Sequence, residues 1–83
     1  MATIRLFASI KEKIGAAELH IRISDRQLLR NVLAQAASDN GVEEAWLVSH
    51  RLLYAVNQQM AGLDHMVGDG DEIAVLPPMS GGV

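Results

Sequence analysis

An apolar stripe with helical spacing in the middle of the chain constrains the fold most. Between positions 28 and 37, apolar side chains recur at i, i+1, i+4, i+5, i+8 and i+9, so one helix face carries Leu28, Leu29, Val32, Leu33, Ala36 and Ala37. Ser24 with Gln27 three residues later predicts a capping box, and Asn40-Gly41 predicts the carboxyl end. A helix with one apolar face needs a second apolar layer to cover it.

Segments on both sides of this helix alternate with the period of two that is typical of strands. In the segment 18–23, for example, Leu19, Ile21 and Ile23 share one face. The order β-β-α-β-β predicts an α+β domain over residues 1–76, a small mixed sheet packed on one main helix. The expected strands are 3–8, 18–23, 52–57 and 72–76; short helical turns are expected at 9–15 and 42–51, a turn or short hairpin at 58–62, and a Gly-Asp-Gly-Asp turn at 68–71.

Composition excludes several classes of function. The 83 residues contain no cysteine, which rules out disulfides and thiolate metal sites, and His20, His50 and His65 lack the spacing of metal ligands. Seven scattered Lys and Arg with a net charge of −3 argue against nucleic acid as a partner. No apolar run approaches the roughly 20 residues that cross a bilayer, and the first residues lack a secretory signal pattern. We therefore expect a cytoplasmic protein with no metal and no membrane contact.

The end of the sequence reads as an extended tail, residues 77–83. Pro77 and Pro78 stop the last strand because proline has no N–H to donate, and they favour extended backbone. Gly81 and Gly82 leave a bare backbone that fits a narrow channel. Six extended residues reach roughly 20 Å, far enough to enter the active site of a partner.

Together these segments resemble one family, the small subunits of molybdopterin synthase, which are ubiquitin-like sulfur carriers. The resemblance covers essentially the whole chain and is weakest at 42–51. The residues that carry it are LFA at 6–8 with Gly15, YAVNQQM at 54–60, DH at 64–65, GDGDE at 68–72 and PPMSGG at 77–82.

The resemblance implies a β-grasp fold, with the last strand central beside the first. It also implies that an E1-like enzyme uses ATP to adenylate the carboxylate of Gly82, that sulfur replaces the adenylate, and that the thiocarboxylate tail enters the large synthase subunit of a heterotetramer. There the sulfur would pass to cyclic pyranopterin monophosphate in molybdenum cofactor biosynthesis. The chain itself would bind no cofactor and would not be an enzyme. Expected partner contacts are Phe7, Met60, Leu76, Pro77, Pro78, Met79 and Ser80, with Gly81 and Gly82 as the reactive end.

Val83 departs from the family pattern, which ends on the second glycine. Three explanations account for this extra residue. A protease removes Val83, or Val83 was added when the chain was cloned or crystallised, or this chain has lost the sulfur-transfer role. Three other functions stay open: a sulfur carrier for thiamin thiazole or tRNA thiolation, a ubiquitin-like protein modifier, and an interaction module that acts through its body.

Overall fold

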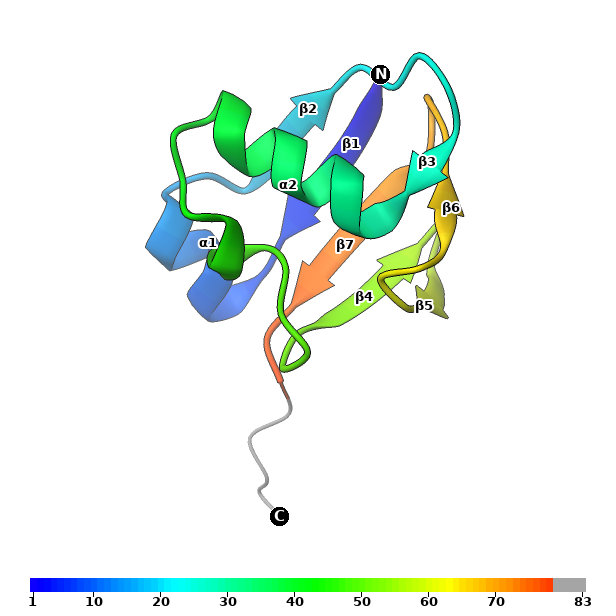
Figure 1. Ribbon diagram of the computed structural model, residues 1–83. Coiled ribbons are helices and arrows are strands. Elements are labelled where there is room, and N and C mark those ends of the chain that lie inside the picture. Colours follow the sequence, from blue (N-terminus) through cyan, green and yellow to red (C-terminus); the bar gives the residue numbers. More distant parts are fainter. Residues whose placement is uncertain (79–83) are drawn as a thin grey trace.

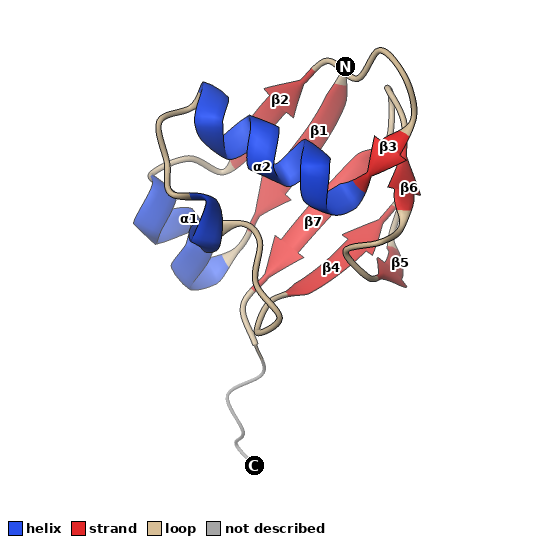
Figure 2. Ribbon diagram, viewed as in Figure 1, coloured by secondary structure: helices blue, strands red, loops and turns tan. Residues whose placement is uncertain are grey.

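A computed structural model describes residues 1–78 of the chain. A five-stranded sheet lies behind the main helix, with a second, two-stranded sheet at its edge (Figures 1 and 2). The strands are β1 (Ala2–Leu6), β2 (Glu18–Ile21), β3 (Gln27–Leu28), β4 (Leu53–Val56), β5 (Gln59–Ala61), β6 (Met66–Val67) and β7 (Glu72–Leu76). The helices are α1 (Ala8–Ile14), α2 (Leu29–Asp39) and a 3₁₀ turn (Glu44–Trp46).

The large sheet has the strand order β2-β1-β7-β4-β5. β7 runs parallel to β1, and the other neighbours are antiparallel, so the sheet is mixed. α2 crosses one face of this sheet (Figure 1). The α+β, β-grasp fold that the sequence predicted is therefore confirmed, including the central position of the last strand beside the first.

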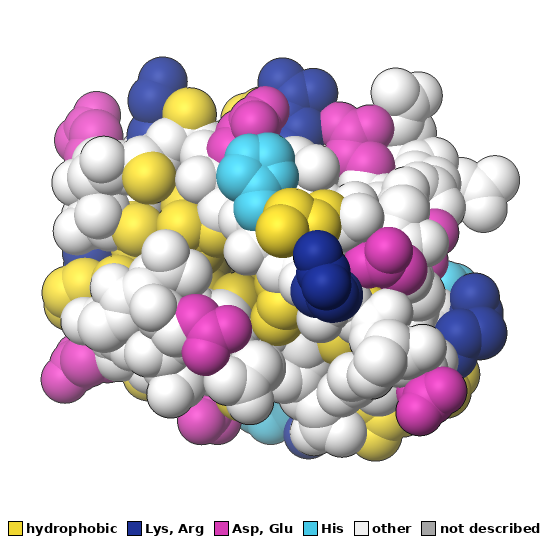
Figure 3. Space-filling view, turned by 90° about the horizontal axis from the view of Figure 1, so that it is seen from above, with side chains coloured by type: hydrophobic (Ala, Val, Ile, Leu, Met, Phe, Trp, Pro, Cys, Tyr) yellow, Lys and Arg dark blue, Asp and Glu magenta, His cyan; other side chains and the backbone are white. Residues whose placement is uncertain are grey.

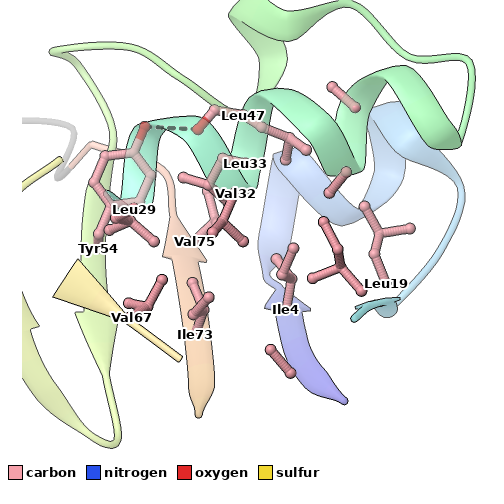
Figure 4. Packing of buried hydrophobic residues seen from close by; sticks show 14 of the residues in the cluster. Ile4, Leu19, Leu29, Val32, Leu33, Leu47, Tyr54, Val67, Ile73 and Val75 are labelled. Atoms are coloured by element: carbon pink, nitrogen blue, oxygen red, sulfur yellow. Dashed lines mark hydrogen bonds between the residues drawn. The ribbon is translucent and has the colours of Figure 1, made fainter. Parts of the chain in front are cut away.

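The core lies between α2 and the sheet, as the two periodicities predict. The buried residues of β1, β2, β4 and β7 alternate along each strand, and the buried residues of α2 form the predicted stripe from Leu29 onward (Figure 4). Leu28, predicted as the first residue of that stripe, lies half-buried in β3 instead, because Gln27 and Leu28 pair with β6. The 3₁₀ turn is the short second helix that was expected within 42–51, and Leu47, directly after it, is fully buried. The Tyr54 hydroxyl donates to the Leu47 carbonyl at 2.7 Å and so ties this loop to β4.

The predicted capping box at Ser24 and Gln27 is wrong. Gln27 and Leu28 form β3, which pairs with β6, and the N-cap is Leu28 without a side-chain hydrogen bond. Backbone carbonyls from a distant loop satisfy the first amides of α2: Leu29 donates to His65 at 2.8 Å and Arg30 to Leu63 at 3.0 Å. Tertiary hydrogen bonds thus replace the local cap.

The other differences concern where elements end. β1 stops at Leu6 and Ala8 begins α1, a seven-residue helix where one turn was expected. β2 stops at Ile21, although Ile23 is still buried. The hairpin between β4 and β5 confirms the prediction for 58–62, while the two-residue strand β6 is too short to leave a periodic signal.

Candidate functional site

The point where the tail leaves the domain is fixed by the central strand β7. Hydrogen-bonded neighbours hold β7 on both sides: Val75 pairs with Leu6 of β1, and Leu76 pairs with Leu53 of β4. Pro77 is half-buried and Pro78 is exposed directly after it. We call Pro77-Pro78 the tail root. Because it continues the best-supported strand of the sheet, its position and direction are set by the fold.

An apolar surface lies on the face of the sheet that α2 leaves uncovered. Alternation puts Tyr54 and Val56 into the core and turns Leu53 and Ala55 outward. Ala55 pairs with Met60 on one side and with Ala74 on the other, and Leu53 pairs with Leu76. These five outward residues form a continuous patch, the outer patch: Leu53, Ala55, Met60, Ala74 and Leu76.

Phe7 lies next to this patch, at the end of β1. Its backbone is extended, so alternation places it on the same side as Arg5, whose guanidinium carbon is 5.7 Å from the centre of the Phe7 ring. Leu6 pairs with Val75, which brings Phe7 level with Leu76. Phe7 is half-buried and is not part of the buried core.

Charged residues border the outer patch on the β1–β2 side. Arg5 donates to Glu72 at 3.1 Å, and Glu18 stands opposite Arg5 in the antiparallel pair. Because these groups are solvated and partly paired, they add little stability. Their effect is to confine the apolar surface to the part of the sheet nearest the tail root.

The sequence located part of this surface. Met60 is 68% exposed, as expected for a contact residue, whereas Phe7, Leu76 and Pro77 are half-buried. Met79, Ser80, Gly81 and Gly82 lie outside the described residues, and their roles stay predictions. Leu53, Ala55 and Ala74 were missed, although the alternation that places Tyr54 in the core also turns both neighbours of Tyr54 outward.

Two observations on the described residues concern charged side chains and possible metal ligands. Within residues 1–78, no charged side chain is buried and no three His, Asp or Glu side chains come together as metal ligands. In that same range, no helix has the length and apolar character needed to cross a membrane. The end of the molecule shown in Figure 3 mixes acidic, basic and neutral side chains, so this face lacks the continuous positive surface that binds phosphate backbones.

Comparison with known proteins places the chain in a family. The model of the ThiS family matches residues 4–82. Two curated relatives, the molybdopterin synthase sulfur carrier subunits of Escherichia coli and Haemophilus influenzae, are 37% and 34% identical to this chain. Both alignments cover 99% of this chain and 100% of the relative. The solution structure of small archaeal modifier protein 1 from Methanosarcina acetivorans superposes with a TM-score of 0.76 at 24% identity, covering 98% of this chain and 95% of that one.

The mixed sheet with a central last strand and the main helix across one face is a ubiquitin-like β-grasp fold. Among proteins with this fold, the chain belongs to the ThiS family.

Proposed function

We propose that the chain is the sulfur carrier subunit of molybdopterin synthase. The observation that carries this proposal is the placement of the tail root: β7 delivers Pro77-Pro78 at the border of the outer patch, in a chain that matches sulfur carrier subunits over its full length. A sulfur carrier needs a rigid domain that binds the partner and a narrow tail that enters the partner's active site. The outer patch and the tail root supply these two parts.

The chemistry takes place on the carboxylate of Gly82. An oxygen of this carboxylate attacks the α-phosphorus of ATP, pyrophosphate leaves, and the resulting acyl-adenylate has AMP as a good leaving group. A sulfur nucleophile then displaces AMP and the thiocarboxylate forms. Before adenylation, hydrolysis of the peptide bond after Gly82 frees the carboxylate, so a protease that removes Val83 precedes the activating enzyme. ATP is consumed by that enzyme, and this chain binds no cofactor.

The outer patch is the docking surface for the large synthase subunit. Met60 and Leu53 are exposed, and Ala55 lies between Met60 and Ala74, which gives an apolar surface for burial against a partner. Met79, Ser80 and Gly81 would then follow the tail root into the partner's active site, within a heterotetramer. The activating enzyme binds the same tail. The whole assembly functions in the cytoplasm.

A reconstituted reaction tests the proposal. The forms ending at Gly82 and at Val83 are each incubated with the activating enzyme, ATP and a sulfide source, and their intact masses are measured. Only the form ending at Gly82 should gain the mass difference of sulfur for oxygen. The matched control is the Gly82 form without ATP, which should keep its mass.

Protein purified from its own cell gives the decisive comparison. We expect a pool without Val83, part of it thiocarboxylated, and loss of molybdoenzyme activity when Gly81-Gly82 is deleted. A chain that keeps Val83 throughout and never carries sulfur would refute the proposal. A Gly82–lysine adduct with intact molybdoenzyme activity would identify a protein modifier instead, and rescue of thiamin or tRNA thiolation would identify another sulfur pathway.

A further inference from the structure

A groove of about 260 Å³ opens beside the tail root, between α1 and the 3₁₀ turn. Pro77 and Pro78 form one of its walls. Its other apolar lining residues come from two further segments: Ile10 from α1, and Ala45, Trp46 and Leu52 from the stretch 45–52. The groove is thus distinct from the outer patch, which lies on the sheet face that α2 leaves uncovered, but the two surfaces meet at the tail root.

Two cationic side chains line this apolar groove. The Lys13 ammonium nitrogen is 5.2 Å from the centre of the Trp46 ring, and Arg51 lies on the loop that precedes β4. No carboxylate lines the groove in the described chain, and within residues 1–78 neither cation forms an ion pair. An apolar floor with a positive rim suits a ligand that combines an apolar side chain with a carboxylate.

The position of the groove indicates which partner carries that ligand. A partner channel that enclosed the tail from its exit point would have its rim against the body on all sides of Pro77-Pro78. The outer patch occupies one side of this exit and the groove another. A partner that covered only the patch would leave the groove side of the channel mouth open to water.

We propose that the groove binds an acidic and apolar segment of the subunit that accepts the tail. This inference rests on the proposed function, because it assumes that the tail enters a partner. The segment places an apolar side chain against Trp46 and Leu52 and a carboxylate near Lys13 and Arg51. The groove is then a second docking point that fixes the rotation of the body about its tail.

Charge reversal in the full chain tests this docking point. Lys13→Glu and Arg51→Glu are each titrated against the large synthase subunit by calorimetry. Each should weaken binding about tenfold at low salt, with a smaller difference at high salt because mobile ions screen the interaction. Lys13→Arg should bind like the unchanged protein. Arg22→Glu is the matched control, since it makes the same charge change just beyond the end of β2, away from the tail root.

The outcomes separate the groove from the function. If Lys13→Glu and Arg51→Glu bind as tightly as Arg22→Glu, the groove is not a docking point and the inference is overturned, while the carrier function stands. Weaker binding to the activating enzyme alone would also overturn it. If the unchanged protein fails to bind the large subunit at all, the proposed function fails and the groove proposal with it. Urea unfolding of each variant is the control for stability: a variant that binds weakly but unfolds at the same urea concentration as the unchanged protein has kept its fold.

Discussion

The two faces of the five-stranded sheet carry similar side chains in opposite surroundings. On β7, Ile73 and Val75 are fully buried beneath α2, whereas Ala74 and Leu76 alternate with them on the outer face and stay partly exposed. Burying an apolar side chain stabilises a fold by about 1.5–3 kcal/mol, and leaving one in water forgoes that gain. An apolar outer face therefore points to a partner, because the fold itself does not need it.

The faces also differ in extent. The inner face is apolar across four of the five strands, from Leu19 of β2 to Tyr54 of β4. The outer face is apolar only near the tail root, and it becomes charged at Arg5 and Glu72. Stability requires an apolar inner face throughout the domain. Docking requires an apolar outer face only around the tail. The substitutions below contrast the two faces, with Asp71 in the turn before β7 as a further case, in order of decreasing effect on the free energy of unfolding.

Leu33→Ala on the inner side should have the largest effect. Leu33 is fully buried in α2, so truncation removes buried methyl groups and leaves a cavity, at a cost of about 2–5 kcal/mol in the free energy of unfolding. Urea titration followed by circular dichroism measures the loss. Asn31→Ala, at an exposed position of the same helix, should change stability by less than about 0.5 kcal/mol. Equal effects of the two substitutions would show that α2 does not cover the core as described.

Tyr54→Phe should cost less, about 1–3 kcal/mol. The hydroxyl donates to the buried Leu47 carbonyl at 2.7 Å and accepts the Ser49 amide at 3.0 Å, and removing it leaves both without this partner. Burial also raises the pKa of Tyr54, with a smaller opposing effect of the hydrogen bond from Ser49. The unfolded chain then loses the Tyr54 proton first, so this contribution to stability falls as the pH rises above about 10. Tyr54→Phe should lose stability less steeply than the unchanged protein in alkaline urea titrations; parallel slopes would contradict this.

Asp71→Asn should lower stability at neutral pH and should reduce the loss of stability in acid. The Gly68 amide, which donates to Asp71 at 2.8 Å, lowers the pKa of this carboxyl most, and the Asn57 amide lowers it further. The folded protein holds this carboxylate ionised below the pKa of the unfolded chain, so stability falls as the pH drops through about 4. Urea midpoints at neutral and acid pH should therefore differ less in Asp71→Asn than in the unchanged protein. An equal difference in both would rule out this contribution.

Met60→Ala on the outer face should have the smallest effect on folding, below about 0.5 kcal/mol, because its side chain is already largely in water. Its effect should appear in binding: we expect affinity for the large synthase subunit to fall about tenfold, as for a contact residue of an interface. Calorimetric titration checks the affinity and urea unfolding the stability. A variant that unfolds like Leu33→Ala yet binds normally would assign Met60 to the core and remove it from the outer patch.

Sequence patterns located the elements better than their connections. The predicted stripe was confirmed from Leu29 to Ala37, though not at Leu28, and the helix end at Asn40-Gly41 was confirmed as well. Both signals are local: Gly41 takes the left-handed φ of 69°, and the Val42 amide donates to the Ala37 carbonyl at 2.9 Å. The capping-box prediction was wrong because the first amides of α2 donate to the carbonyls of Leu63 and His65, which are distant in the sequence, and not to Ser24. No pattern within 24–28 contains that information.

The candidate site was predicted in the same partial way. Met60, Leu76 and the Pro77-Pro78 root were picked out by their place in the motif, and their roles as contacts stay predictions. Leu53 and Ala74 were missed because their neighbours Tyr54 and Ile73 dominate the apolar pattern. The groove at Trp46 left no sequence signal, since three segments far apart in the chain assemble it.

The sequence by itself determined which residues face inward, where the main helix ends, and that a proline pair follows the last strand. These features depend on periodicity and on the backbone geometry of a few neighbouring residues. The place of β7 beside β1 already followed from the family resemblance. Only the tertiary structure decided that β4 is the other neighbour of β7, so that Leu53 stands beside Leu76 and the outer patch meets the tail root. The physical reason is that strand pairing joins residues far apart in the chain through backbone hydrogen bonds, and every residue except proline offers the same backbone groups.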